Sequence, residues 1–200
     1  MMKPEECLRV IASAKGDAIC VPTMTTAPAW REIAPDDLSV TCLGFMGGAA
    51  SLGLGLALGA PERKVIVLDG DGSLLMQLGS LAAIAAAAPR NLVHMVFKNC
   101  VYQTSGCQVL PGGTCIDFVM IAKGAGYRSG YSFADLDEFR KRLKGLLSEE
   151  GPILLELRTE LAECTPMTAG LGAPFHQQAA ALRAKLAQSG GSFSSSSARK

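Results

Sequence analysis

The sequence predicts an α/β fold, in which helices flank a doubly wound, mostly parallel β-sheet. Short apolar runs alternate with helical patterns along most of the 200-residue chain, and such alternation is typical of parallel sheets. The runs at 64–68 and 92–97 are almost continuously apolar, as expected of parallel strands that helices cover on both faces. Hydrophobic residues make up 48% of the chain, which is enough to bury a substantial core in one domain.

The elements follow from the same patterns in order. Pro4 suits the first turn of a helix, and Pro89 ends a later one. We expect strands at 18–21, 39–43, 64–68, 92–97, 127–131 and 153–157, helices at 5–15, 73–88, 116–125, 134–149 and 175–188, and long loops at 22–35 and 98–115. Residues 46–59 are ambiguous, because their leucines alternate as in a strand whereas their many glycines and alanines permit a closely packed helix.

Three segments follow from this reading. Residues 1–165 form the α/β domain, and residues 166–188 are a C-terminal extension that carries the last helix. Residues 189–200 are rich in serine and glycine, and a segment of that composition is expected to be disordered.

Composition argues against several classes of protein. The net charge is +1 and no basic cluster stands out, so we expect no nucleic-acid partner. The seven cysteines include no Cys-x-x-Cys pair, which fits neither a disulfide framework nor a zinc site and favours the reducing cytoplasm. The first residues lack the apolar core of a signal peptide, and the apolar stretch at 47–60 is too short to span a membrane.

The most informative pattern is a pair of oxygen side chains at the ends of two neighbouring strands. Asp71 follows the run at 65–68 within Gly70-Asp71-Gly72-Ser73, and Asn99 ends the next run 28 residues later. Parallel strands joined by a helix end at the same edge of the sheet, where open α/β sheets bind ligands. Carboxylate and amide oxygens suit Mg²⁺ bound to a phosphate, and the two glycines allow close approach of the backbone. The segment therefore predicts a site for Mg²⁺ and a diphosphate.

Nucleotide-binding motifs are the main alternative for this segment. A lone Gly-Asp-Gly also forms ordinary turns, so the neighbouring strands and Asn99 carry the interpretation. Residues 70–75 and 53–58 both lack the third glycine of the dinucleotide fingerprint, and no Gly-Lys-Ser/Thr sequence is present. We therefore favour the metal–diphosphate site.

This spacing of Gly70-Asp71-Gly72 and Asn99 resembles the signature of the thiamin diphosphate-dependent decarboxylase family, over roughly residues 15–160. The resemblance implies that Asp71, Asn99 and the main-chain carbonyl of Val101 bind Mg²⁺. It also implies that the cofactor lies against Gly70, Gly72, Ser73 and Tyr102. The family usually has Asn-Asn where this chain has Lys98-Asn99, and the second Asn, the ligand, is retained.

A second segment supports the same resemblance. Gly44-Phe45-Met46-Gly47 is similar to the Gly-Ser-Met-Gly segment that precedes a small-residue helix in the family, so we take 46–59 as a helix. By this resemblance the Gly44 carbonyl accepts a hydrogen bond from the cofactor's amino group, and Met46 wedges the cofactor into a bent shape. Phe45 and Gly47 complete this predicted contact, with Phe45 in place of the usual serine.

The resemblance also identifies what this chain lacks. In the family, a glutamate of a separate pyrimidine-binding domain activates the cofactor, which then serves as an electron sink for decarboxylation. Only the diphosphate-binding half is recognised here, and Glu5 and Glu6 belong to the wrong element to replace that glutamate. We therefore expect a pyrimidine-domain subunit as partner, in a hetero-oligomer, or a homo-oligomer.

Within the family, the chain looks most like the sulfopyruvate decarboxylase β subunit and the C-terminal half of phosphonopyruvate decarboxylase. The implied substrate is a small anionic 2-keto acid. An acetolactate-synthase-like carboligase subunit and a non-catalytic cofactor-binding module are the alternatives. His94 is interpreted as a residue of the core and His176 as a surface residue, whereas the roles of Lys98 and Cys100 stay open.

Overall fold

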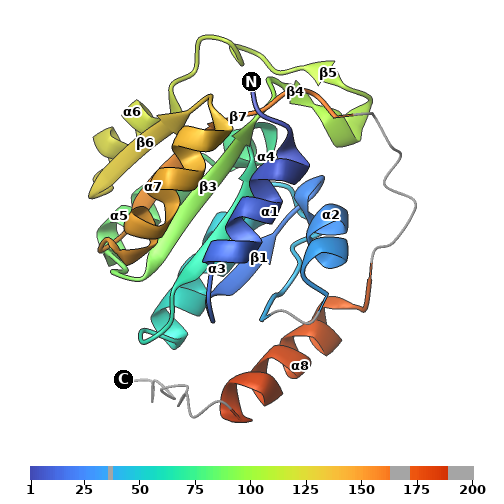
Figure 1. The fold of residues 1–200 in the computed structure, drawn as a ribbon, viewed down its shortest axis with the longest axis vertical. Coiled ribbons are helices and arrows are strands. Elements are labelled where there is room, and N and C mark those ends of the chain that lie inside the picture. Colours follow the sequence, from blue (N-terminus) through green and yellow to red (C-terminus); the bar gives the residue numbers. More distant parts are fainter. Residues whose placement is uncertain (36–37, 163–171, 189–200) are drawn as a thin grey trace.

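A five-stranded parallel sheet forms the centre of the molecule, which confirms the predicted fold class (Figure 1). The computed structural model describes residues 1–35, 38–162 and 172–188. The strand order is β1-β2-β3-β7-β6 and every pairing in this sheet is parallel. The strands are β1 (Ile19–Pro22), β2 (Val65–Gly70), β3 (Leu92–Lys98), β6 (Ser129–Phe133) and β7 (Ile153–Arg158).

Strands β2 and β3 are buried along almost their whole length because helices cover both of their faces. All of β3 is buried, and β2 is buried up to Asp69, as predicted from their continuous apolar runs. In the register of this pair, Gly70 lies beside Phe97. The chain therefore leaves β2 and β3 at the same edge of the sheet, and the next residues on each side include Asp71 and Asn99.

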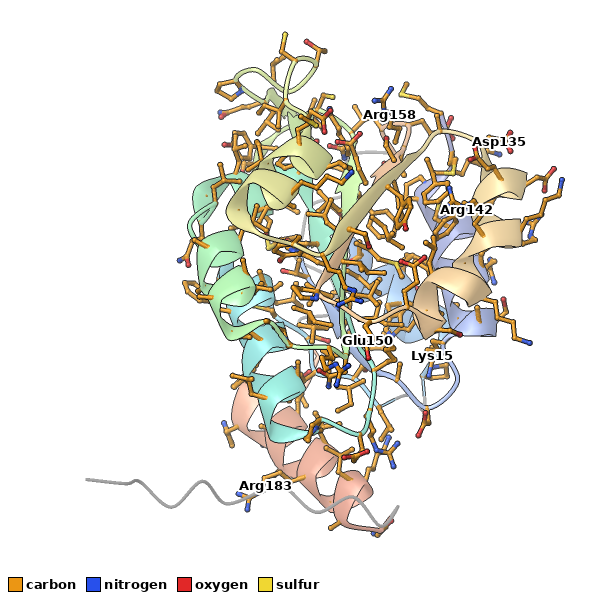
Figure 2. The ribbon with its side chains drawn as sticks, turned by 90° about the vertical axis from the view of Figure 1, so that its left-hand side faces the viewer. Lys15, Asp135, Arg142, Glu150, Arg158 and Arg183 are labelled. Atoms are coloured by element: carbon orange, nitrogen blue, oxygen red, sulfur yellow. The ribbon has the colours of Figure 1, made fainter. Side chains whose placement is uncertain are left out.

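Helices form one layer on each side of the sheet (Figure 2). The first layer contains α1 (Pro4–Ala14), α2 (Thr26–Ile33) and α7 (Leu136–Ser148), and it shares a core cluster with one face of the sheet. The second contains α3 (Gly48–Gly59), α4 (Asp71–Met76), α5 (Ser80–Ala87) and α6 (Phe118–Ala125), which share the other core cluster.

Most of the segment at 46–59 is helical, as the resemblance implied, although the helix begins at Gly48. It forms α3, and its small residues allow the helix to lie very close to the sheet. A Cβ atom on Gly53 would lie only 2.3 Å from Cγ2 of Val67 in β2. The alternating leucines therefore do not indicate a strand, because close packing of a glycine-rich helix face determines this segment.

Two sequence predictions about helices are wrong. Residues 22–35 are not simply a loop, because α2 forms there and buries Trp30, which is 1% exposed. The single helix expected at 73–88 is two helices, α4 and α5, separated at Gln77–Gly79. Gln77 packs where a side chain of Gly47 would lie. The break between α4 and α5 therefore lies where the chain contacts the segment around Gly47, which is distant in sequence.

Two further predictions need correction. Residues 39–43 run beside β1 but form only isolated bridges, Cys20 with Ser39 and Thr23 with Cys42, so this segment is not a full strand. The loop expected at 98–115 contains a small antiparallel hairpin of β4 (Val101–Tyr102) and β5 (Gln108–Val109), joined through the 3₁₀ turn η1 (Gln103–Ser105). Its strands are two residues long, too short to give a sequence signal.

The C-terminal helix α8 (Phe175–Gln188) forms where it was predicted. It buries Leu182 and Leu186, and the side chain of Gln178 accepts a hydrogen bond from the Thr41 amide.

The boundary at 165 and the expected disorder of 189–200 concern positions outside the described residues and stay predictions. None of the helices in the described ranges is long and apolar enough to cross a membrane.

Cysteine pairing differs in one respect from the expectation. Among the described cysteines, Cys7, Cys20, Cys42, Cys100 and Cys115 are free thiols, in agreement with the absence of a disulfide framework. Cys107, in contrast, is disulfide-bonded. Its sequence context offered no signal for this bond, because no cysteine lies at a recognisable spacing.

Candidate functional site

The structure brings Asp71 and Asn99 together at the carboxyl edge of the sheet. Oδ2 of Asp71 accepts a hydrogen bond of 2.6 Å from the amide of Cys100, the residue after Asn99. Oδ1 of Asp71 accepts from the Gly72 amide at 2.8 Å. The ends of β2 and β3 are therefore connected directly, through the carboxylate that the sequence singled out.

Asn99 is held by its own loop. Its Oδ1 accepts from the Val101 amide at 3.1 Å, and its Nδ2 donates to Oε1 of Gln103 at 2.9 Å. Cys100 between them has a positive φ of 64°, so the backbone turns sharply after Asn99. This turn directs the Cys100 amide to Asp71.

The Asp71 carboxylate is buried, with an exposed fraction of 2%. Burial raises its pKa above the ordinary carboxyl value, although the amides of Cys100 and Gly72 oppose the rise. A buried carboxylate with a raised pKa gains from a nearby cation. This environment fits a metal ion bound at Asp71.

The available donors suit Mg²⁺ better than a transition metal. A carboxylate offers about four acceptor positions, and Asp71 uses two of them for amides. Over the part of the chain that the structure describes, no group of three or more His, Cys, Asp or Glu side chains could hold a metal. One carboxylate, one amide oxygen and main-chain carbonyls form the hard, oxygen-only set that Mg²⁺ prefers.

Gly72 and Ser73 connect the two predicted motifs. A Cβ atom on Gly72 would lie 2.6 Å from the ring of Tyr102, so only glycine allows this approach. Ser73 Oγ accepts a hydrogen bond of 3.0 Å from the amide of Gly47. The segment at 44–47 is thus fixed to the start of α4, which begins at Asp71 rather than at Ser73 as predicted.

The segment at 44–47 contributes unequally to the cavity. Gly44 and Gly47 adopt positive φ angles of 74° and 88°, which favours glycine at both positions. Met46 lines the cavity, but Gly44, Phe45 and Gly47 are not among its lining residues. The Phe45 side chain is 57% exposed, and its ring packs where a side chain of Gly48 would lie.

These residues surround a cavity of about 380 Å³. Of the predicted site residues, eight line it: Met46, Gly70, Asp71, Gly72, Ser73, Asn99, Val101 and Tyr102. Sequence reasoning missed the opposite wall, formed by residues of α1 and α2 and by the segments that adjoin them. They include Glu5, Leu8, Thr26, Pro28 and Glu32.

Among the described residues, the charged side chains that line this cavity are all acidic. Asp71, Glu5 and Glu32 contribute carboxyl groups, and no described lining residue is basic. Glu5 was expected in an element unrelated to the site, yet α1 places it in the wall. The two glutamates are exposed, unlike Asp71, so they lie at the solvent side of the cavity.

The remaining candidates have structural partners. His94 is fully buried between Asp69, at 3.2 Å, and the Tyr127 hydroxyl, at 3.3 Å, which supports a role in the core; His176 is exposed. The Cys100 thiol donates to the Gly113 carbonyl at 3.3 Å. Burial, and then the Asp71 carboxylate, raises the pKa of this thiol, so it is a poor nucleophile.

Comparison with known proteins identifies the fold and the domain. Residues 22–157 match the family described as thiamine pyrophosphate enzyme, C-terminal TPP binding domain. A solved structure of a thiamine diphosphate-dependent 4-hydroxybenzoylformate decarboxylase from Rhodococcus jostii RHA1 superposes with a TM-score of 0.68 at 26% identity. That superposition covers 80% of this chain and 33% of the other.

Curated relatives are similar in sequence but longer. Phosphonopyruvate decarboxylase of Streptomyces viridochromogenes is 40% identical over 152 residues, which cover 74% of this chain and 37% of the relative. The sulfopyruvate decarboxylase subunit beta of Methanocaldococcus jannaschii is 45% identical over 108 residues, covering 54% of this chain and 56% of the relative. Because the family match covers residues 22–157, the chain belongs to the thiamine pyrophosphate enzymes, as a C-terminal TPP-binding domain.

Proposed function

We propose that this chain is the cofactor-binding subunit of a thiamin diphosphate-dependent 2-keto acid decarboxylase. The observation that carries the proposal is the hydrogen bond from the Cys100 amide to Asp71, since it holds the predicted metal ligands at one edge of the sheet. Asp71, Asn99 and the Val101 carbonyl bind Mg²⁺, which in turn binds the diphosphate. Gly70, Gly72, Ser73 and Tyr102 form the surface against which the diphosphate lies.

The cofactor, when bound, supplies an electron sink for the carbanion that decarboxylation generates. The protein's part is to bind and orient it. Met46 lies in the cavity wall, where it would support the bent shape of a bound cofactor. Gly44 lies two residues before Met46, outside the cavity lining, and the resemblance alone suggests that its carbonyl would accept from the cofactor's amino group. Phe45 and Gly47 fix this segment through contacts with Gly48 and Ser73.

The proposed substrate is 3-sulfopyruvate or 3-phosphonopyruvate, a small 2-keto acid with a second anionic group. The support is similarity to relatives with these named activities. Since no basic residue is among the described residues of the cavity wall, we infer that basic side chains that neutralise the substrate come from another chain. We therefore propose a pyrimidine-domain partner chain that supplies both the activating glutamate and these basic groups.

The location of the protein in the cytoplasm remains a prediction.

Isothermal titration of thiamin diphosphate into the purified chain, with and without Mg²⁺, tests the cofactor site. We expect Mg²⁺-dependent binding that Asp71→Ala removes. Asp135→Ala is a matched control, because Asp135, labelled in Figure 2, also accepts a main-chain amide but does so at the start of α7 and is not among the residues that line the cavity. If Asp71→Ala binds the cofactor as tightly as the wild-type chain, the assignment of Asp71 as the metal ligand is wrong.

Release of CO₂ tests the activity. The chain, co-expressed with a pyrimidine-domain subunit, is assayed with sulfopyruvate, phosphonopyruvate and pyruvate. We expect turnover of one of the two acids that carry a second anion, and much slower turnover of pyruvate. A complex that binds thiamin diphosphate but decarboxylates none of the three would refute the proposed reaction while leaving the cofactor site intact.

A further inference from the structure

The side chain of Lys98 points away from the cavity, although its neighbours Phe97 and Asn99 both line it. Its side chain is 7% exposed, and the ammonium group donates a hydrogen bond to the main-chain carbonyl of Ile116. It also lies 3.7 Å from Oε2 of Glu156 in β7 and 5.9 Å from the centre of the Phe118 ring. Lys98 therefore does not reach the substrate, and its partners all lie on the opposite side of β3.

Glu156 is the centre of this buried arrangement. Its carboxylate, 2% exposed, accepts hydrogen bonds from the Ser132 hydroxyl at 2.9 Å and from Nε of Arg158 at 3.1 Å. Its other oxygen accepts from the amide of Phe118 at 3.4 Å. We call Lys98, Ser132, Glu156 and Arg158 the loop-base cluster. Figure 2 shows Arg158 at the same end of the sheet as the hairpin loop, far from Glu150.

The loop-base cluster joins the two ends of one loop. The loop of residues 99–117 begins directly after Lys98, the last residue of β3, and ends before Phe118, the first residue of α6. Lys98 binds the carbonyl of Ile116 at the returning end, and Glu156 binds the amide of Phe118. The same loop carries Asn99 and Val101, and its Cys100 amide binds Asp71.

From this geometry we propose that Lys98 is a positioning residue, which closes the base of the 99–117 loop and so fixes Asn99 and the Cys100 amide against Asp71. The expected effect of Lys98 on Mg²⁺ affinity rests on the proposed cofactor site, whereas its expected effect on the opening of the loop does not. Groups that orient metal ligands from outside the coordination sphere typically change metal affinity by about 10- to 100-fold when removed. Lys98 is expected to act within that range.

The test compares three variants. Lys98→Met removes the ammonium group but keeps most of the length of the side chain, and it leaves the buried Glu156 carboxylate with Arg158 as its remaining cationic partner. The double variant Lys98→Met/Glu156→Gln removes that buried negative charge as well, so it recovers stability without restoring the contact with Ile116. Lys64→Met is the matched control, because Lys64 also donates to a main-chain carbonyl, that of Glu149, at the opposite edge of the sheet.

Two measurements separate positioning from simple stability. Hydrogen exchange, followed by NMR, reports the Cys100 and Val101 amides, whose acceptors are Asp71 and Asn99. We expect exchange at least about 10-fold faster in both Lys98 variants, because the local opening of the loop becomes easier, and no change in Lys64→Met. Titration of Mg²⁺ in the presence of thiamin diphosphate should show about 10-fold weaker binding in the same two variants.

The double variant decides the outcome. If its melting temperature approaches that of the wild-type chain while both amides still exchange rapidly, the positioning role is supported. If its amides are as protected as in the wild-type chain, Lys98 contributes only to stability and the inference is wrong. Because exchange is measured without cofactor, absence of thiamin diphosphate binding would refute the proposed function and not this inference.

Discussion

Replacing Gly72 with alanine tests whether the close approach of Gly72 and Tyr102 shapes the cofactor site. The new methyl group would lie 2.6 and 2.8 Å from two ring carbons of Tyr102 and 3.5 Å from Cδ1 of Leu110. Carbon atoms pack best at about 3.5–4.0 Å, so the ring must retreat by roughly 1 Å. Tyr102 is half-buried and lines the cavity, so its ring can move, but only by changing the cavity wall.

The magnitude follows from opposing terms. Overpacking costs about 1–3 kcal/mol, whereas alanine gains about 0.5–1 kcal/mol over glycine inside a helix. We therefore expect a net loss of stability of about 0–2.5 kcal/mol. Cofactor affinity should fall more clearly, by at least about 10-fold, which corresponds to 1.4 kcal/mol.

Urea unfolding and isothermal titration with thiamin diphosphate and Mg²⁺ measure the two effects. Gly55→Ala in α3 is the control, since nothing lies within 4 Å of its added methyl group. It should stabilise the chain slightly and leave cofactor binding unchanged. Wild-type affinity in Gly72→Ala would refute the argument that this contact fixes the cavity wall.

Three further predictions concern the core, the buried histidine and pH. In Gly53→Ala, the methyl group would lie 2.3 Å from Val67, so urea unfolding should show a loss of about 1–3 kcal/mol that Val67→Ala partly reverses. Tyr127→Phe removes the hydroxyl beside His94 and should cost about 1 kcal/mol in the same assay, with cofactor titration unaffected. Burial raises the pKa of Asp71, so the Asp71 carboxyl keeps its proton to higher pH in the folded chain than in the unfolded chain. The contribution of Asp71 to stability is therefore present at low pH and is lost as pH rises through the raised pKa. Mg²⁺ competes with that proton, so the increase in melting temperature caused by Mg²⁺ with thiamin diphosphate should be larger near about pH 7.5 than near about pH 5. It should be absent in Asp71→Asn, and an equal increase at both pH values would contradict the assignment of Asp71 as a metal ligand.

The sequence could predict one half of the site because that half depends on local order. Each of β2 and β3 is a short apolar run with a polar residue just beyond its end, and parallel pairing places those ends together. The contact between Asp71 and the Cys100 amide follows from this arrangement. Strand alternation could also have shown the direction of Lys98, because Phe97 faces the cavity and consecutive side chains of a strand point to opposite faces.

The other half of the cavity depends on contacts between distant segments. Glu5 and Glu32 reach it because α1 and α2 pack on the same face of the sheet, and the helix around Trp30 was mistaken for a loop. The break between α4 and α5 likewise lies where Gln77 meets Gly47, a segment far away in sequence. Hydrophobic periodicity and secondary-structure propensity describe one segment at a time, so neither of them predicts contacts between segments that are distant in sequence.

The charge of the cavity has a consequence for the order of binding. Asp71 needs a cation, and Mg²⁺ with the diphosphate satisfies it, but Glu5 and Glu32 remain on the opposite wall without a basic residue in the lining. An anionic keto acid approaching this chain alone would meet like charge, which opposes its binding. Basic side chains from a second chain would neutralise the two glutamates and create the attraction that the substrate needs. If the proposed partner supplies those side chains, cofactor should bind this chain before the partner does, and the proposed substrate only afterwards.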